Sequence, residues 1–286
     1  MRNQIMCVAV LLAAVLPMSV LAEWTTPVPV ASGINTQSES MPYLSYDGLS
    51  LYFDRGTDSI YEAKRSQPSG NFTSVSQVLS GGGHIVCPWV SPDNLRMYYH
   101  QESGSWQVKM STRASVNDPW SSGTAVAGLP SNIALPSLSE DELTIVYDNP
   151  SVGGWDMYIA TRDSKTSVFG NIRSLSEINT ADMEMRPFLS PDALSIYYCD
   201  ATLSQIFEAT RASLNDPFGN VQHLSQFDMP GGWRSLYPAI SSDGKSFYFT
   251  TGANTADIYV SYNIPEPATI TLLGIGGLIL RRKSKN

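Results

Sequence analysis

Between residues 23 and 263, short segments with alternating apolar and polar positions are separated by turns rich in Ser, Asp, Asn and Gly. One such stretch, MPYLSYDGLSLYF (residues 41–53), returns in similar form four more times. Alternation with a period of two is typical of β-strands with one buried face, and Ser, Asp and Gly are common turn residues. Each copy therefore predicts two strands joined by a tight turn.

The copies align on an aspartate, and successive aspartates are 46, 48, 51 and 51 residues apart. A proline stands five residues before each aspartate, a serine two residues before it, and an aromatic residue six residues after it. The aspartates are Asp47, Asp93, Asp141, Asp192 and Asp243, and the prolines are Pro42, Pro88, Pro136, Pro187 and Pro238. A strand-rich repeat of this length is typical of the blades of a β-propeller.

Each unit contains two further strand-like segments. One is an alternating run such as IYEAKR (60–65), and the other opens at an aromatic residue that lies 16 to 20 residues before the proline. These aromatic residues are Trp24, Phe72, Trp120, Phe169 and Phe218. Because the series begins with EWTTPVPV (23–30) and ends after IYVSYN (258–263), we expect the first strand to complete the last blade. The predicted fold is all-β: a five-bladed propeller of four-stranded blades, closed by its N-terminal strand.

The unit P-x-x-S-x-D-G-x-x-L-Y-F … D-I-Y-x-x-x-R … N-D-P-W resembles the WD-repeat-like propeller repeat of TolB-type proteins over nearly all of residues 23–263. The resemblance implies the propeller fold and, for function, a scaffold or binding module, with some enzymes among related propellers. Glu142 and Ala193 replace the glycine found at Gly48 and Gly244. We therefore expect that the five turns do not all share one left-handed geometry.

Residues that recur in every blade are expected to be structural. A turn aspartate accepts backbone N–H groups in each copy, whereas a catalytic carboxylate is normally needed once or as an unequal pair. An arginine also recurs at one position, as Arg65, Arg113, Arg162 and Arg211. We interpret this column as a set of ion pairs at the strand ends, and not as a cluster that binds carboxylates.

Function is expected where the blades differ. In a propeller, the loops between blades and the loops between second and third strands emerge on one face around the channel. The candidate binding residues there are Glu39, Arg55, His84, Asp148, Glu184, Arg186, Trp233 and Arg234, and the same loops also carry Asp54, Asp58, His100, Glu102, Trp106, Asn132, Trp155, Asp182 and Asp200. Tryptophans beside charged groups suit a carbohydrate, because aromatic planes stack on C–H surfaces and polar groups bind hydroxyls.

The two ends of the chain predict export. Residues 1–22 have the order of a secretory signal peptide, with Arg2, an apolar run and small residues before Glu23; a membrane-anchoring first helix is the alternative. Residues 264–286 hold the triplet Pro265, Glu266 and Pro267, an apolar run (268–280) and a basic cluster. This order resembles the PEP-CTERM sorting tail, which implies an exosortase as processing partner. The alternative is a permanent C-terminal membrane anchor.

Charge and composition limit the partners. The chain has 286 residues with 42% hydrophobic content, enough for a packed core, and residues 23–263 carry 13 Lys and Arg against 25 Asp and Glu. Their formal charge of −12, without a basic stripe, argues against nucleic acid as a partner and limits membrane contact to the C-terminal tail. Cys87 and Cys199 lie in different positions of the repeat, which favours two buried free thiols over a disulfide.

Sequence signatures of enzymes are mostly missing. There is no G-x-S-x-G, H-E-x-x-H, glycine-rich phosphate loop or C-x-x-C, and His84, His100 and His223 lack the spacing of metal ligands. The sequence thus predicts no metal site and no cofactor. The leading hypothesis is a non-catalytic propeller that binds a glycan or protein of the cell surface, outer envelope or extracellular matrix. A glycosidase with a carboxylate pair and a purely structural matrix protein are the alternatives.

Overall fold

The computed structural model describes residues 23–30, 33–102, 104–151, 154–252 and 255–264. Contacts divide the chain into two units, of which Trp24–Asn263 holds nearly all described residues. The predicted signal peptide (1–22) and, apart from Ile264, the predicted sorting tail (264–286) lie outside the described residues. Among the described residues, no helix has the length and hydrophobicity required to cross a membrane.

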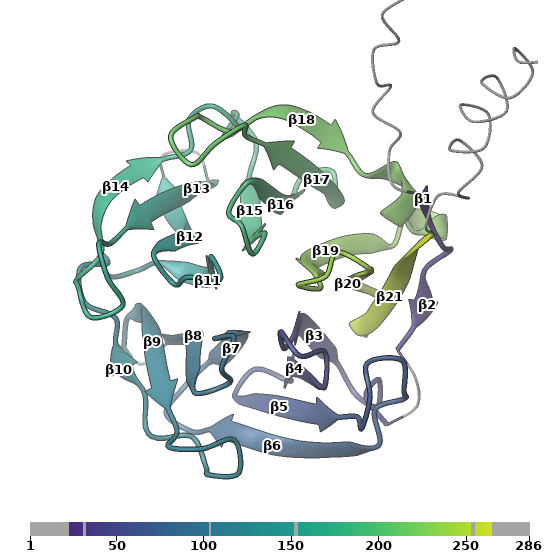
Figure 1. The fold of residues 1–286 in the computed structure, drawn as a ribbon. Helices are drawn as coiled ribbons and strands as arrows, with labels where there is room; N and C mark the ends of the chain where they lie inside the picture. Colours follow the sequence, from purple (N-terminus) through teal and green to yellow (C-terminus); the bar gives the residue numbers. More distant parts are fainter. Residues whose placement is uncertain (1–22, 31–32, 103, 152–153, 253–254, 265–286) are drawn as a thin grey trace, which may run out of the picture. The chain divides into compact units, whose positions relative to one another are not determined.

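Unit Trp24–Asn263 forms five antiparallel sheets arranged radially around a common centre (Figure 1). Blades 1 and 2 contain β3 (Glu39–Leu44), β4 (Ser50–Arg55), β5 (Ser59–Lys64) and β6 (Ser74–Ser80), then β7 (Ile85–Val90), β8 (Arg96–Glu102), β9 (Trp106–Thr112) and β10 (Thr124–Ala125). Blades 3 and 4 contain β11 (Ala134–Leu138), β12 (Thr144–Ser151), β13 (Gly154–Thr161) and β14 (Gly170–Ser174), then β15 (Glu184–Leu189), β16 (Ser195–Asp200), β17 (Gln205–Thr210) and β18 (Gly219–His223). Blade 5 contains β19 (Arg234–Ile240), β20 (Ser246–Gly252) and β21 (Asp257–Ile264), preceded by the 3-10 turns η1 (Ser225–Phe227) and η2 (Pro230–Gly232). The predicted five-bladed propeller is confirmed.

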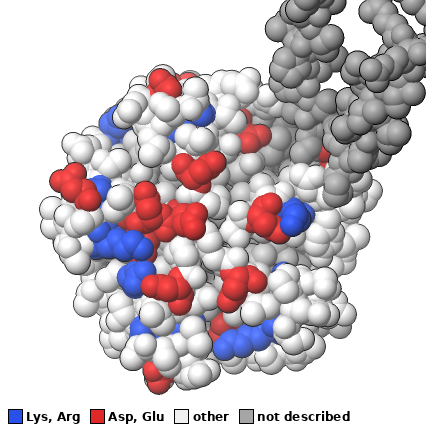
Figure 2. Space-filling model, in the orientation of Figure 1, with Lys and Arg blue, Asp and Glu red and all other residues white. Residues whose placement is uncertain are grey.

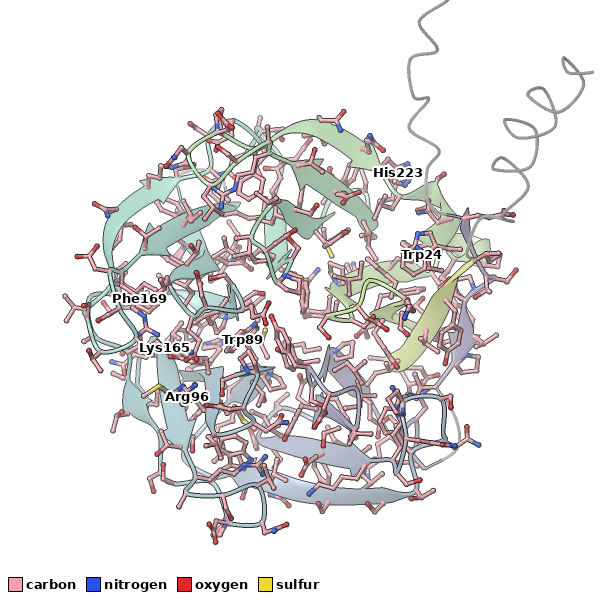
Figure 3. The ribbon with its side chains drawn as sticks, in the orientation of Figure 1. Trp24, Trp89, Arg96, Lys165, Phe169 and His223 are labelled. Atoms are coloured by element: carbon pink, nitrogen blue, oxygen red, sulfur yellow. The ribbon has the colours of Figure 1, made fainter. Side chains whose placement is uncertain are left out.

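The ring is closed by the N-terminal segment, as the phase of the repeat predicts. Strands β1 (Glu23–Trp24) and β2 (Val28–Pro29) both pair with β21, and Thr25 donates its backbone N–H to the Tyr262 carbonyl at 2.9 Å. The Trp24 ring packs edge-on against Phe227 at 5.7 Å and Phe247 at 5.8 Å (Figure 3). Blade 5 therefore has its outer edge covered by residues more than 200 positions away in the sequence.

All five turns share one geometry, so the expectation that Glu142 and Ala193 change it is wrong. In each turn the serine hydroxyl donates to the aspartate, and the residue after the aspartate has a φ between 57° and 69°. The backbone N–H of that residue also bonds to the serine carbonyl in every copy. These bonds hold the left-handed conformation and offset its cost of about 1 kcal/mol in a residue other than glycine.

Glu142 uses this conformation to connect two blades. Its fully buried carboxylate accepts bonds from Arg96 at 2.7 and 2.8 Å, from Lys165 Nζ at 2.8 Å and from the Tyr98 hydroxyl at 3.1 Å. Burial alone would raise the pKa of Glu142, but the bonds from Arg96 and Lys165 lower it overall. Figure 3 shows that Arg96 and Lys165 lie on the same side of the ring. A turn residue thereby joins blade 2 to blade 3.

The recurring arginines stack on aromatic rings, which corrects the interpretation as an ion-pair column. Each guanidinium lies 4.2 to 4.6 Å from the centre of the ring that opens the outer segment of its blade, and each Nε donates to a turn carbonyl at 2.6 to 2.8 Å. The pairs are Arg65–Phe72, Arg113–Trp120, Arg162–Phe169 and Arg211–Phe218. Within the described residues, only Arg162 approaches a carboxylate, Glu142 at 4.0 Å. A planar guanidinium can stack its face on an aromatic ring while its edge donates hydrogen bonds. Each of these arginines can therefore contact the aromatic ring and the turn carbonyl at the same time.

On the face shown in Figure 2, acidic side chains gather around the centre of the ring, and the fewer basic ones lie beside them. Near one channel opening, burial and the charges of Glu140, Asp141 and Asp192 raise the pKa of Tyr46. An opening bordered by carboxylates disfavours polyanions, in agreement with the formal charge of residues 23–263.

Ring closure gives the first prediction. Trp24→Ala should lower the free energy of unfolding by about 2 kcal/mol through lost aromatic packing, and deletion of residues 24–30 should lower it further by exposing β21. Chemical denaturation measures both, with Thr26→Ala as the control substitution. An unchanged unfolding midpoint in the deletion variant would contradict the role of closure.

Candidate binding face

The centre of the ring is lined by the residue before each recurring proline. Each of these residues has a φ between 53° and 63° and lies in a bulge, where the pairing of the inner strand with the second strand shifts register. They are Met41, Cys87, Leu135, Arg186 and Tyr237, and with the prolines they enclose a cavity of about 30 Å³. Such a cavity has room for water only, so the channel itself cannot admit a sugar.

Side chains of the neighbouring blade bond to two of these left-handed residues. The position seven residues after each turn aspartate carries Asp54, His100, Asp148, Cys199 and Thr250. Asp148 accepts the Arg186 N–H at 3.0 Å and Thr250 accepts the Met41 N–H at 3.2 Å, whereas the two ring nitrogens of His100 and Oδ1 of Asp54 have no hydrogen-bond partner among the described residues. The sequence contained a signal for this column, because a hydrogen-bonding residue follows the recurring aromatic residue in every blade.

Asp54 and Asp148 are therefore buried between blades and do not face solvent. Burial raises the pKa of Asp54 to about 7, although bonds from the Ser40 hydroxyl and the Cys87 N–H oppose the rise. Burial raises the pKa of Asp148 to about 8, against the Arg186 N–H and the Arg186 charge. Of the candidate residues, Asp148 and Arg186 are thus brought together by a contact that also stabilises the ring.

Glu39 and Glu184 occupy equivalent buried positions and support the loops that precede them. Glu39 accepts the backbone N–H groups of Thr36 and Gln37 at 3.1 Å, and it accepts Arg55 Nε at 2.6 Å. Glu184 accepts the N–H and hydroxyl of Thr180 at 2.8 and 2.5 Å. These contacts engage both carboxylates and leave little of either exposed to a ligand.

Three other candidates lie in blades 4 and 5. The Arg186 guanidinium stacks on the Tyr237 ring at 4.5 Å, and its Nε has no hydrogen-bond partner among the described residues. Trp233 and Arg234 are exposed where blade 5 begins. Arg234 borders a pocket of about 320 Å³ whose lining includes Ser40 of β3 and Thr250 and Thr251 of β20.

Four aromatic side chains form a continuous group, which we call the tryptophan–histidine group. Trp106 and Trp155 lie at the beginning of β9 and β13, His100 lies in β8, and His84 precedes β7. The two indoles stack with centres 4.9 Å apart and planes at 16°, while His100 meets Trp106 at 5.5 Å and His84 at 5.9 Å. Burial, with the His84 charge, lowers the pKa of His100 to about 4, so this ring is neutral at physiological pH. The two indoles and His84 are partly exposed.

The tryptophan–histidine group rests on the bulged residues, because its indoles pack with Met41, Cys87, Leu135 and Tyr237 in one apolar cluster. A rigid aromatic surface of this kind can stack on the apolar face of a sugar ring.

Within the described residues, no three His, Cys, Asp or Glu side chains group to hold a metal ion. Cys87 and Cys199 are free thiols as predicted, although only Cys199 is fully buried.

No protein-family model and no curated protein matches the sequence. Among solved structures, the catalytic domain of a GH62 α-L-arabinofuranosidase from Coprinopsis cinerea is 9% identical, with a TM-score of 0.57, and 85% of this chain and 97% of that chain are covered. TolB from Acinetobacter baumannii is 14% identical, with a TM-score of 0.51 over 80% of this chain and 55% of that chain. A gluconolactonase from Xanthomonas campestris is 10% identical, with a TM-score of 0.51 over 85% of this chain and 96% of that chain.

At these identities the likeness establishes the fold alone. The chain has a TolB-like β-propeller fold, which it shares with proteins named as enzymes. The choice between binding and catalysis therefore depends on this chain's own side chains.

The buried carboxylates give a prediction about pH. A carboxyl whose pKa is raised on folding contributes stability at low pH, and that contribution is lost as the pH rises through about 7 for Asp54 and about 8 for Asp148. Because the ordinary pKa of both carboxyls is 3.8, the melting temperature should fall between about pH 4 and about pH 8. Asp54→Asn should flatten part of this fall, and Asp58→Asn, at an exposed position, should leave it unchanged. Parallel curves for the wild type and Asp54→Asn would contradict the assignment.

Proposed function

We propose that this protein is an exported, non-catalytic propeller that binds a glycan of the cell surface, outer envelope or extracellular matrix. The observation that carries the proposal is the stacked, partly exposed pair Trp106 and Trp155 at the channel mouth. Aromatic side chains ordered before binding lose little conformational entropy when a sugar stacks on them. A glycan fits better than a protein partner, because the group offers flat rings and the central cavity is too small for an apolar anchor.

The positions of the carboxylates favour binding over glycoside hydrolysis. Hydrolysis by a carboxylate pair requires two acids about 5 to 9.5 Å apart with a sugar between them. Asp54 and Asp148 are the carboxylates that hold the bulges, and the cavity beside the bulged residues measures about 30 Å³. Glu39 and Glu184 are engaged by their own loops. These four buried acids therefore serve the fold, which supports binding as the proposed role of this face.

Export is supported by the two ends of the sequence. Residues 1–22 have the order of a secretory signal peptide, and Pro265, Glu266 and Pro267 precede an apolar run and a basic cluster. The prolines favour an extended backbone around Glu266, which is the form a processing enzyme binds. An exosortase-type enzyme is the processing partner in this proposal, and the mature propeller leaves the inner membrane.

Binding is tested with a glycan array on the purified full chain. Trp106→Ala and Trp155→Ala should each weaken binding of the selected glycan about tenfold, since stacking contributes on the order of 1 kcal/mol or more. Tyr262→Ala, at an exposed aromatic ring on β21 outside the candidate binding residues, is the control. A full array without any bound glycan would overturn the proposal, and release of shortened sugars from a bound glycan would establish an enzyme instead.

Sorting is tested by mass spectrometry of the protein from a host that contains an exosortase. Wild-type mature chain should end within or near the Pro-Glu-Pro triplet, while replacement of Pro265, Glu266 and Pro267 by alanine should leave the full-length chain in the inner membrane. An intact Asn286 on the wild-type mature chain would establish a permanent anchor in place of sorting.

A further inference from the structure

A groove of about 610 Å³ is lined by residues of strand β6 in blade 1 and by residues of blade 2. Figure 1 shows that these two blades are neighbours in the ring. It shares no lining residue with the central cavity and none with the tryptophan–histidine group. Its volume lies within the range of about 300 to 1,000 Å³ typical of small-molecule sites.

The groove arises from a departure in blade 2 from the repeat. Strand β10 has two residues, whereas the corresponding β6 has seven and β14 and β18 have five each. After Trp120 the chain continues with Ser121, Ser122 and Gly123, and the Tyr99 ring lies close to Gly123. A Cβ at position 123 would lie 2.0 Å from the Tyr99 hydroxyl oxygen, so glycine is required for this close approach. The short outer strand leaves the side of blade 2 open.

The lining offers hydrogen bonds around an indole. Gln77, Ser80 and Ser122 are exposed along the groove, and the buried Gln101 amide is fixed by the carbonyls of the glycine loop at 3.1 and 3.3 Å. Trp120 forms part of the wall and is only 9% exposed, and its Nε1 has no acceptor among the described residues. A buried N–H without a partner is costly, and a ligand oxygen or a bridging water at the inner end of the groove would satisfy it.

The groove also differs in charge from the rest of the molecule. Lys109 is the one charged side chain among its 13 lining residues, and no ion pair involves Lys109 within the described part of the chain. In a body with a formal charge of −12, a site that holds one cation and no carboxylate favours an anionic group locally. Amides, hydroxyls, an indole and one ammonium group together match a sugar that carries a carboxylate.

We propose that the groove between blades 1 and 2 binds an oligosaccharide that contains a uronic acid unit. The uronate carboxylate pairs with Lys109, the sugar hydroxyls bond to Gln77, Ser80 and Ser122, and the inner end of the chain supplies an oxygen to Trp120 Nε1. This site is separate from the channel mouth and does not depend on the function proposed for the tryptophan–histidine group.

Isothermal titration calorimetry on the purified full chain tests the groove with α-1,4-linked trigalacturonate and the neutral α-1,4-linked galactotriose. Trigalacturonate should bind about tenfold more tightly than galactotriose. Lys109→Gln should weaken trigalacturonate binding about fivefold and reduce its salt dependence. Lys245→Gln, at an exposed lysine outside the groove, is the matched control, and Ser122→Trp should block the groove. Circular dichroism and melting curves establish that each variant is folded.

Several results would overturn the proposal. These are no binding of trigalacturonate, equal affinity for the two trisaccharides, or full retention of binding in both Lys109→Gln and Ser122→Trp. Competition by acetate at the same concentration would show a simple anion site. Loss of binding in Trp106→Ala with retention in Lys109→Gln would place the uronide at the channel mouth and leave the function proposed there standing.

Discussion

The left-handed residue before each inner-strand proline is the constraint on which the centre of the molecule depends. Its bulge brings side chains such as Arg186 and Tyr237 into the channel, where they occupy most of the space. Its N–H is released from the strand ladder and needs an acceptor, which the neighbouring blade supplies through Asp148 or Thr250 in the clearest cases. One local conformation therefore both fills the channel and joins successive blades.

This arrangement determines where a ligand can bind. Because the channel is filled, binding surface remains at its mouth and between the outer parts of the blades. The mouth carries the stacked indoles of Trp106 and Trp155, which pack directly on the bulged residues and take their rigidity from them. Between blades 1 and 2, the short strand β10 provides a polar groove of a different chemical character. The groove lies where blade 2 departs from the repeat, whereas the two indoles come from corresponding positions at the beginning of β9 and β13 in blades 2 and 3.

The buried carboxylates differ in the groups that compensate their charge. Glu142 is paired with cations and has a lowered pKa, whereas burial raises the pKa values of Asp54 and Asp148, and the rise is opposed chiefly by the Ser40 hydroxyl and the Arg186 N–H respectively. Hydrogen bonds from neutral donors offset less of the desolvation cost of a carboxylate than a salt bridge does. The contributions of Asp54 and Asp148 to stability therefore fall as the pH rises, whereas the contribution of Glu142 falls as the pH is lowered.

The sequence by itself determined the five blades, their strands and the closing role of residues 23–30, because strand alternation and turn chemistry are local and repeat five times. It also separated shared residues from variable ones, and so pointed to the face that holds His84 and the tryptophans. Only the tertiary structure decided which variable residues are accessible. Asp148 and Glu39 look like ligands in the sequence, yet Asp148 accepts the Arg186 N–H of the next blade, and Glu39 is buried and accepts N–H groups of its own loop together with Arg55 Nε. The stacking of each arginine on the aromatic ring seven residues later was also decided by side-chain packing, and the bond from Arg96 to Glu142 joins two blades that the sequence pattern does not pair.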